Sequence, residues 1–409
     1  MGLIVQKFGG TSLANAEKIH RAARRAIRAQ LDDNRVVVVV SAMDKTTDEL
    51  VDLAYQITDR PSRREMDQLL ATGEQISIAL MAMAIHHAGH DAISLTGGQI
   101  GLRTDRAFGR ARIREITERG RILSQLKQGS IVIVAGFQGV DEALNITTLG
   151  RGGSDTTAVA LAASLGADVC EIYTDVDGIY SADPRIVPGA RKLNFVFYDE
   201  MLELASLGAQ VMHSRSIELG KNYDVTIHVR SSYTDAKGTD IVKVSSDLEQ
   251  VIVRGAALKK DLARVELVGV PNRPGLASEI FSQVAKRGVI VDDIIQVVHE
   301  GGATADMSFT IEAADKEQAE VAGAELGKEL TGMRMIIKEN LAKVSVVGVG
   351  MRTHTGVASR MFEALHQADV NIENISTSEI VVSCVVKAVD GEKALRAVHA
   401  AFELDQESK

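Results

Sequence analysis

The stretch LGRGGSDTT, residues 149–157, lies between an apolar run at residues 131–137 and a helix-like run at residues 158–165. This pattern predicts a buried strand, a glycine-rich turn and a helix. The three glycines remove side chains from the turn, so backbone N–H groups can approach an anion at the positive end of the helix. Arg151 adds a planar guanidinium suited to a carboxylate or a phosphate. We interpret the turn as an anion-binding site. The alternative is an ordinary glycine-rich loop in which Ser154 or Asp155 caps the helix.

The composition indicates a soluble protein of several domains. At about 100–200 residues per domain, 409 residues correspond to two to four units. A net charge of −9 argues against a general nucleic-acid binder, and we interpret the basic cluster at residues 21–25 as a solvated helix face. Cys170 and Cys384 each lie in an apolar, strand-like run, which gives little support to disulfides or a cysteine metal site. No signal peptide and no apolar run of membrane-spanning length is present, so we expect a cytoplasmic protein with no membrane partner.

The first part of the chain alternates strands, glycine turns and helices. We expect a strand at residues 3–8, a turn at residues 9–12 and a helix at residues 14–31. The five valines at residues 36–40 predict a central parallel strand, because β-branched side chains on both faces need cover on both faces. Ligands of open α/β sheets bind beyond the carboxyl ends of the strands, which places Lys7 and Ser41 at one edge. Lys7 precedes its glycines, unlike the lysine of a P-loop, and the alternative is a surface lysine beside a tight turn.

Three later segments complete this half of the chain. Residues 76–85 predict a buried helix. Glu74 lies just before it, where the helix dipole stabilises a carboxylate; the functional alternative is that Glu74 accepts a hydrogen bond from a substrate ammonium. Residues 104–128 are arginine-rich and are expected to be helical. A strand ending near Thr174 is followed by Asp175 and Asp177, which lack the other ligands of a calcium loop, and Arg185 can reach a phosphate tail.

The last third of the chain contains an internal repeat. Residues 265–294 and 344–375 share a strand, a glycine turn, a helix and a second strand, with Gly275 matching Gly356 and Phe281 matching Phe362. Each copy predicts a βαββαβ unit of ferredoxin-like type. Two copies form a pair rather than a solenoid.

Four separated motifs follow the order of one family. They are KFGGTS at residues 7–12, TGE at 72–74, RGGSDTT at 151–157, and YTDVDG at 173–178 with DPR at 183–185. With the paired repeats, the whole chain resembles monofunctional bacterial aspartate kinases. The resemblance implies an α/β fold: a three-layer αβα amino-acid-kinase domain with a mostly parallel central sheet, then two ferredoxin-like ACT domains. It implies domains at residues 1–240, 263–335 and 343–405, with residues 251–258 adding a strand to the second ACT domain.

The same resemblance implies phosphoryl transfer from ATP, with Mg²⁺, to the side-chain carboxylate of L-aspartate, giving 4-phospho-L-aspartate and ADP. This reaction is the first step of lysine, threonine and methionine biosynthesis. The resemblance assigns Lys7, Phe8, Gly9, Gly10, Thr174, Asp175, Tyr180 and Arg185 to the nucleotide, and Ser41, Thr47, Glu74, Arg151, Gly152, Gly153 and Ser154 to aspartate. The attacking carboxylate is already a nucleophile, so catalysis needs alignment and charge neutralisation rather than a general base.

We expect three residues to be catalytic. Lys7 is the cation expected at the β- and γ-phosphates, Arg151 pairs a carboxylate of aspartate, and Asp155 is expected to orient Lys7 through an ion pair. Mg²⁺ would be held mostly by phosphates and water, so no protein metal ligand is assigned.

The ACT pair implies feedback control by an end-product amino acid, lysine, threonine or both. The expected effector residues are Asn272, Pro274, Gly275, Leu276, Ala277, Ser278, Asp292, Asp293 and Gln296, with Asn374 and Ile375 in the second copy. Such modules bind ligands where they pack side by side, so we expect a homo-oligomer formed through the ACT domains, with the option of a shorter subunit made of the ACT half.

Two positions depart from the family pattern. Residues 41–47 read SAMDKTT where such enzymes often carry SAMGDTT, which should alter loop flexibility and charge near the substrate. Gln210 stands where some relatives have a lysine near the nucleotide, and we leave it out of the site.

Two alternative functions stay open at this point. One is another amino-acid kinase of glutamate-kinase type, which the RGGSDTT turn and the ACT pair disfavour. The other is a catalytically inactive amino-acid sensor, which intact Lys7, Glu74, Arg151 and Asp175 disfavour.

Overall fold

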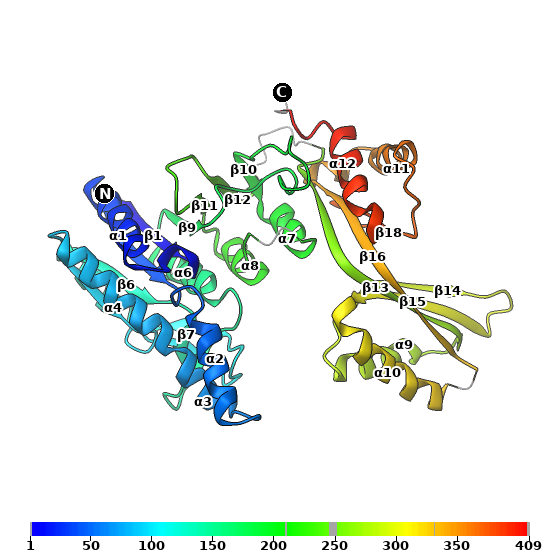
Figure 1. Cartoon of the computed structure of the whole chain (residues 1–409), viewed down its shortest axis with the longest axis horizontal. Coiled ribbons are helices and arrows are strands. Elements are labelled where there is room, and N and C mark those ends of the chain that lie inside the picture. The colour runs from blue at the N-terminus through cyan, green and yellow to red at the C-terminus, as the bar shows by residue number, and fades with distance from the viewer. Residues whose placement is uncertain (1, 209–210, 245–251, 331, 407–409) are drawn as a thin grey trace. The chain divides into compact units, whose positions relative to one another are not determined.

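The computed structural model describes residues 2–208, 211–244, 252–330 and 332–406, which form two compact units (Figure 1). The first unit contains Met1–Tyr180, Lys192–Ser206 and Gln210–Leu248, and the second contains Ser181–Arg191, Leu207–Ala209 and Glu249–Lys409. Gln210, whose departure from the family pattern was noted above, lies outside the described residues.

The first unit is built on an eight-stranded sheet in the order β10-β12-β11-β9-β1-β2-β6-β3. All its neighbouring strands are parallel except β11 and β12, which confirms the mostly parallel central sheet. The strands are β1 (Gly2–Phe8), β2 (Asn34–Val40), β3 (Ala92–Leu95), β6 (Ile131–Ala135), β9 (Val169–Thr174), β10 (Phe195–Phe197), β11 (Ile227–Ser231) and β12 (Thr239–Val242).

The valines of β2 show why this sheet is covered on both faces. Val36, Val38 and Val40 pack in one core with side chains of α1 (Ala16–Leu31) and α4 (Thr72–His87). Val37 and Val39 point to the opposite face and are also fully buried. That face carries α6 (Gly153–Leu165), with α8 (Ser214–Tyr223) and α7 (Tyr198–Ser206) farther along. The cover on both faces expected from the valine run and the three-layer arrangement implied by the resemblance are both confirmed.

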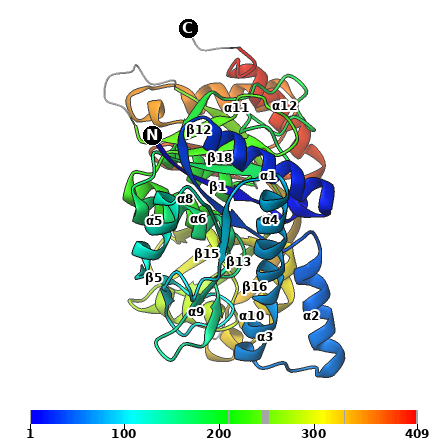
Figure 2. The same cartoon turned by 90° about the vertical axis from the view of Figure 1, so that its left-hand side faces the viewer.

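The prediction of a buried helix at residues 76–85 is only half right. Ile78 and Met81 of α4 are buried, but Ile76, Leu80 and Met83 on its other side are exposed. Apolar side chains lie on all sides of this helix, but the rest of the first unit packs against only one side of it. The preceding α3 (Arg63–Leu70) continues into α4 along one line (Figure 2). By length and composition the helical stretch Arg63–His87 could cross a membrane, but 56% of its most apolar window is buried inside the unit, as in a core helix.

The prediction of a helix at residues 104–128 is wrong for most of that range. The chain forms β4 (Leu102–Thr104) and β5 (Ile113–Ile116), and only α5 (Arg119–Lys127) is helical. With β7 (Gln138–Val140) and β8 (Ile146–Thr148) these strands make a second sheet in the order β5-β4-β7-β8. The Asp105 carboxylate accepts hydrogen bonds from the backbone N–H groups of Ala107 and Arg112, which closes residues 105–112 into a loop. Local side-chain bonds of this kind compete with helix formation.

The second unit contains a six-stranded antiparallel sheet in the order β14-β15-β13-β16-β18-β17. Two long strands, β13 (Gly255–Pro271) and β16 (Arg334–Val347), run through both βαββαβ copies. The other elements are α9 (Leu276–Lys286), β14 (Asp292–Val298), β15 (Thr304–Glu312), α10 (Lys316–Glu329), α11 (Val357–Gln367), β17 (Asn374–Thr377), β18 (Val381–Lys387) and α12 (Gly391–Ala401). Residues 255–259 of β13 pair with residues 343–347 of β16, next to β18. Part of the segment expected to add a strand, Val251, lies outside the described residues.

Candidate active site

A cavity of about 830 Å³ opens in the first unit where β1, β2 and the turn before α6 meet. The expected residues that line it are Lys7, Gly10, Ser41, Thr47, Glu74, Arg151, Gly152, Gly153, Ser154 and Asp155. They come from four separate stretches of sequence, at residues 7–10, 41–47, 74 and 151–155, which the parallel sheet brings together near the carboxyl ends of its strands. The cavity is large enough for a small-molecule site.

The glycine turn leaves the N-terminus of α6 open toward the cavity. Gly150 and Gly152 adopt φ of 79° and 67°, and a Cβ at position 152 would lie 2.3 Å from Cβ of His213. Only glycine fits there. The residue before α6 is Gly152, and no side chain caps the helix, so the alternative in which Ser154 or Asp155 caps it is wrong. Backbone N–H groups of the first turn therefore remain available to an anion.

Lys7 is a buried cation rather than a surface lysine. It lies near the carboxyl end of β1, and its Nζ is 2.6 Å from Oδ1 of Asp155 in the first turn of α6. Both side chains are largely shielded from solvent. The ion pair expected from the sequence is present, and it holds a positive charge beside the open helix N-terminus.

Glu74 presents an incompletely bonded carboxylate to the same cavity. Its Oε1 accepts a hydrogen bond from the backbone N–H of Ala42 at 2.9 Å, while Oε2 is buried without a partner among the described residues. Burial, only partly offset by backbone hydrogen bonds, raises the pKa of Glu74 to about 7. A bound ammonium group would satisfy this carboxylate and favour its charged form.

Asp67 organises the far wall of the cavity, a role that the sequence analysis missed. Its carboxylate accepts hydrogen bonds from Thr148 N at 2.7 Å, Thr148 Oγ1 at 2.8 Å and Gly109 N at 3.0 Å. It thereby ties α3 to β8 and to the loop 105–112, which brings Phe108 and Arg110 to the cavity. Arg63 also lines the wall. Partners so far apart along the chain leave no local signal in the sequence.

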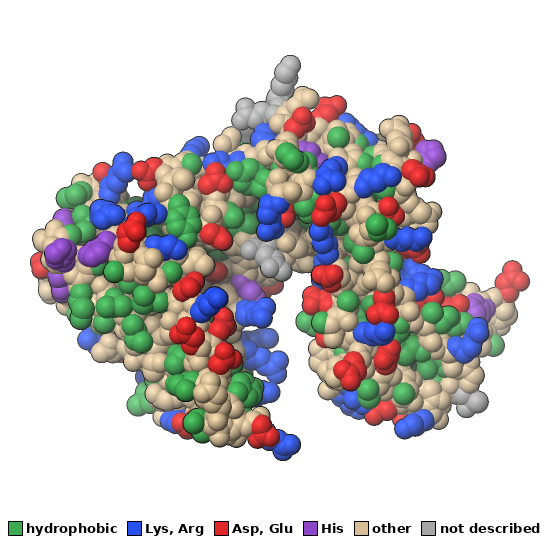
Figure 3. Space-filling model, viewed as in Figure 1, with side chains coloured by type: hydrophobic (Ala, Val, Ile, Leu, Met, Phe, Trp, Pro, Cys, Tyr) green, Lys and Arg blue, Asp and Glu red, His purple; other side chains and the backbone are tan. Residues whose placement is uncertain are grey.

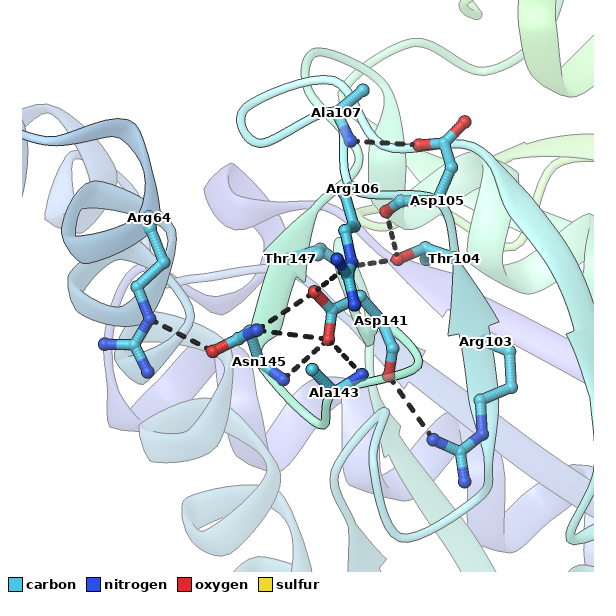
Figure 4. Close-up of polar contacts among 10 residues, drawn as sticks. All are labelled: Arg64, Arg103, Thr104, Asp105, Arg106, Ala107, Asp141, Ala143, Asn145 and Thr147. Atoms are coloured by element: carbon cyan, nitrogen blue, oxygen red, sulfur yellow. Dashed lines mark hydrogen bonds and ion pairs between the residues drawn. The ribbon is translucent and has the colours of Figure 1, made fainter.

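The second sheet of this unit supports that loop (Figure 4). The buried Asp141 accepts hydrogen bonds from the backbone N–H groups of Ala143 and Asn145, both at 2.9 Å. Burial alone would raise the pKa of Asp141, but these bonds and the Asn145 side chain outweigh it and lower the pKa. Thr104 and Thr147 join β4 to β8 through their hydroxyls at 2.6 Å. The loop at the cavity is therefore anchored to this second sheet.

Comparison with known proteins identifies the family. The model of the amino acid kinase family matches residues 2–231, and ACT domain models match residues 264–330 and 344–402. The chain is 51% identical over 405 residues to an aspartokinase of Bacillus sp. (strain MGA3), covering 99% of this chain and 98% of that one. It is also 51% identical over 406 residues to aspartokinase 2 of Bacillus subtilis (strain 168), covering 99% of each. The chain belongs to the aspartokinase family.

Solved aspartokinases have the same fold. Aspartokinase III of E. coli in complex with aspartate and ADP superposes with a TM-score of 0.80 at 26% identity, covering 98% of this chain and 99% of that one. The aspartate kinase of Synechocystis is 44% identical with a TM-score of 0.56, covering 100% of this chain and 70% of that one. These relatives confirm the predicted activity, ATP-dependent phosphorylation of aspartate in the pathway to lysine, threonine and methionine. They also confirm the ACT domains of an allosterically regulated kinase.

The residues expected at the nucleotide lie at the carboxyl ends of the neighbouring strands β1 and β9 and in the segment that follows β9. Of these residues, only Lys7 and Gly10 line the cavity. The rings of Phe8 and Tyr173 stack with their centroids 4.8 Å apart, and Gly9 N donates to Tyr173 O at 3.3 Å. Thr174 Oγ1 donates to Asp175 at 3.0 Å. Tyr180 donates to Asp177, whose other carboxylate oxygen is 3.2 Å from Lys192 Nζ.

Arg185 is placed differently from the other nucleotide candidates. It lies in the segment Ser181–Arg191, which belongs to the second unit, and its guanidinium binds Asp183 at 2.7 Å. Ala182 and Val187 of this segment lie in the core of the second ACT repeat, and Ser181 Oγ is 3.0 Å from His399 Nε2. The nucleotide motif of the sequence is therefore divided between two units.

The expected effector residues of the first ACT repeat lie around the start of α9 and along β14. Pro274, Gly275, Leu276, Ala277 and Ser278 form the turn and first residues of α9, and Gln296 lies on β14. Asn272 Nδ2 donates to Gly302 O at 2.8 Å. Asp292 and Asp293 both bind Lys343 Nζ, at 2.5 and 2.7 Å. Asn374 and Ile375 begin β17 in the second repeat. Lys343 was not predicted from the sequence, because its partners lie on a different strand.

Proposed function

We propose that the 830 Å³ cavity holds aspartate with its side-chain carboxylate at the N-terminus of α6. Arg151 pairs a carboxylate of the substrate, Glu74 accepts from its ammonium group, and Ser154 donates to its carboxylate. The observation that carries this proposal is the meeting of three features in one cavity: the open helix N-terminus, the Lys7 charge and the unpartnered Glu74 oxygen. An amino acid with two carboxylates and one ammonium complements that set. Ser41, Thr47, Gly152 and Gly153 complete the proposed contacts with aspartate.

In the proposed reaction a side-chain carboxylate oxygen of aspartate attacks the γ-phosphorus of ATP. The bond between that phosphorus and the oxygen bridging to the β-phosphate breaks, and its electron pair leaves with ADP. Lys7 neutralises charge on the transferring group, and Asp155 positions Lys7. No proton has to be removed from the nucleophile, so the site needs no general base.

We assign the nucleotide to Lys7, Phe8, Gly9, Gly10, Thr174, Asp175, Tyr180 and Arg185. The ADP complex of E. coli aspartokinase III supports a nucleotide site in this fold. The reaction also requires Mg²⁺. Within the described residues no group of three or more His, Cys, Asp or Glu side chains could hold a metal ion. We propose that phosphate oxygens and water supply most ligands of this ion, as Mg²⁺ prefers.

Regulation is the second part of the proposal. We propose that lysine, threonine or both bind the first ACT repeat at residues 272–278 with Asp292, Asp293 and Gln296, and the second at Asn374 and Ile375. A structure of E. coli aspartokinase III with lysine and aspartate supports lysine as a ligand of this fold. We further propose domains at residues 1–240, 263–335 and 343–405, a strand from residues 251–258 in the second ACT domain, and a cytoplasmic homo-oligomer joined through the ACT domains. A shorter ACT-only subunit remains part of this proposal.

An ATP-dependent hydroxamate assay tests the catalytic proposal directly. Purified protein is incubated with MgATP, hydroxylamine and either aspartate, glutamate or no acceptor. We expect hydroxamate with aspartate only, and no product once Mg²⁺ is chelated. Hydroxamate with glutamate alone would instead support the glutamate-kinase alternative. Repeating the assay with lysine and threonine, singly and together, identifies the effector.

Two variants test the residue assignments. Arg151→Ala should raise the KM for aspartate much more than the KM for ATP, since Arg151 is assigned to the acceptor. Gln296→Ala should relax inhibition while kcat without effector stays close to the wild-type value. Equal effects on both KM values would refute the assignment of Arg151 to aspartate. An inactive Gln296→Ala protein would refute the assignment of Gln296 to the effector site.

A further inference from the structure

The first unit contains a second cavity, of about 540 Å³, that the aspartokinase reaction does not use. Side chains of α1, β1, β9 and β11 line it, and none of its lining residues also lines the active-site cavity. Its volume lies within the range of small-molecule sites and exceeds what a bare inorganic anion would fill.

Arginines dominate the wall of this cavity. Arg21, Arg24, Arg25 and Arg28 have helical spacing on one face of α1, and Arg230 adds a fifth guanidinium from β11. The carboxylates in the lining are Asp32, Glu171 and Asp235. Lys and Arg side chains gather on the surface over the region of α1 (Figure 3). The lining therefore carries an excess of positive charge in a protein whose net charge is −9.

The carboxylates do not neutralise these arginines one to one. Asp235 is shared by Arg25 at 3.1 Å and Arg28 at 3.5 Å. Arg24 has no ion-pair or hydrogen-bond partner for its side chain among the described residues. In addition to its ion pair with Asp235, the guanidinium of Arg25 lies over the ring of Tyr173, 5.0 Å from its centroid. Its side chain is only 13% exposed, so the solvated helix face inferred from the sequence does not describe this residue.

The floor of the cavity is different, because it offers hydrogen-bond acceptors. Glu171 accepts from Gln6 Nε2 at 2.9 Å, from the Tyr173 hydroxyl at 3.0 Å and from Arg230 at 2.8 Å. Gln6 is 1% exposed, and its Oε1 has no donor among the described residues. A buried acceptor without a donor costs roughly 1–3 kcal/mol unless a ligand or water supplies one.

We propose that this cavity binds a phosphorylated small molecule. Its phosphate lies among the α1 arginines, whose planar donors match phosphate oxygens, and its hydroxyl or amino groups point toward Gln6 and Glu171. A simple inorganic anion would pair with the arginines but would offer no hydrogen-bond donor to Gln6 and Glu171. The proposal concerns binding only and does not depend on the roles assigned in the active site.

Glycerol 3-phosphate is a suitable probe because it combines a phosphate with two hydroxyl groups. Isothermal titration uses the full-length protein saturated with aspartate and a non-hydrolysable ATP analogue with Mg²⁺, so that the active site is filled. Glycerol at the same concentration and sodium chloride at the same ionic strength are the ligand controls. We expect binding of glycerol 3-phosphate, tighter than binding of inorganic phosphate, and no binding of glycerol.

The matched variants are Arg24→Glu with Arg28→Glu, and Arg121→Glu as the control. Arg24 and Arg28 are exposed and lie outside the active site, and Arg121 is an exposed arginine on α5 that lines neither cavity. The double variant should weaken binding of glycerol 3-phosphate by about tenfold or more, with unchanged kinase activity and thermal midpoint. Arg121→Glu should bind like the wild type. Equal affinity in the two variants, or no binding of the probe to the wild type, would overturn the proposal.

Discussion

Lys7 Nζ and Asp155 Oδ1 lie 2.6 Å apart, which joins the carboxyl end of β1 to the first turn of α6. The side chains are 11% and 13% exposed, so the pair is protected from water. The positive charge is thereby fixed before any substrate binds. Electrostatic stabilisation of a transferring phosphoryl group is most effective when the charge needs no reorganisation.

Removing Lys7 should therefore reduce the rate more than removing Asp155. Lys7→Ala removes the charge itself, and we expect kcat to fall by about 10²–10³-fold. Asp155→Asn leaves the lysine but frees it to move, and we expect a smaller fall of about tenfold with a higher KM for ATP. Steady-state kinetics of both variants and of the double variant measure the coupling. If the two effects simply multiply in the double variant, Asp155 does not act through Lys7.

The unusual pKa of Glu74 predicts a pH-dependent KM for aspartate. Because burial raises this pKa to about 7, the carboxylate ionises across pH 6–8, and only the charged form pairs with an ammonium group. The KM for aspartate should fall as the pH rises through 7. Glu74→Gln should raise that KM by about tenfold or more and flatten its pH dependence. Glu65→Gln, an exposed neighbour on α3, serves as the control.

The raised pKa of Glu74 also predicts that the protein becomes less stable as the pH rises, although aspartate then binds better. The folded protein binds the Glu74 proton more tightly than the unfolded chain does, so the free energy of unfolding falls as the pH rises from about 4.5 to about 7. Glu74→Gln removes this penalty, and at pH 8 without substrate it should be more stable by roughly 1–3 kcal/mol. Urea unfolding at pH 5 and pH 8 checks the sign. A variant less stable than the wild type at pH 8 would contradict it.

The fold was predictable where one residue pattern had a single physical solution. The valine run of β2 had to be covered on both faces, and the glycines before α6 had to form an open turn. Most active-site side chains follow from these two features, because parallel strands bring their carboxyl ends to one edge.

The errors arose where tertiary contacts decide the outcome. Asp105 turns an arginine-rich segment into a hairpin loop, and Asp67 acts through partners 42 and 81 residues away. Arg25 is similar: its helical spacing suggested a solvated face, but the ring of Tyr173 lies beneath its guanidinium. Nothing in the local sequence specifies which distant element will pack against such side chains.

The departure at Asp44 has a backbone consequence. Asp44 adopts φ of 40°, and its N–H donates to Gly10 O at 3.1 Å, which holds the loop beside the glycine turn of β1. A side chain with a Cβ is strained in this left-handed region, and glycine is not. Asp44→Gly should therefore be at least as stable as the wild type, while Asp44→Ala should be less stable than Asp44→Gly by about 1 kcal/mol.

Asp48, in the first turn of α2 (Thr46–Ile57), provides the matched control. In a helix the order reverses, and Asp48→Ala should be more stable than Asp48→Gly by about 0.5–1 kcal/mol. Thermal and urea unfolding of the four variants measure both differences. If alanine is also the better residue at position 44, the left-handed conformation is not what that loop requires.

Lys343 ties the edge strand β14 to the long strand β16 through Asp292 and Asp293. Its side chain is 3% exposed and that of Asp293 7%. Burial by itself would lower the pKa of Lys343, but hydrogen bonds from Lys343 to both aspartates outweigh it and raise the pKa, so the lysine stays charged. Lys343→Met leaves a buried carboxylate without its cation, and we expect the second unit to lose about 3–5 kcal/mol of stability.

Lys338→Met is the control, since Lys338 lies on the same strand and pairs with Glu266 at 3.0 Å but is 45% exposed. An exposed pair contributes about 1 kcal/mol or less. Adding Asp293→Asn to Lys343→Met should recover much of the loss, because the remaining buried group is then neutral. Hydrogen exchange along β14 and urea unfolding measure these changes, and feedback inhibition should weaken in Lys343→Met while kcat without effector is kept. If Lys343→Met is no less stable than Lys338→Met, the two aspartates do not depend on this lysine and are free to hold a cationic effector by themselves.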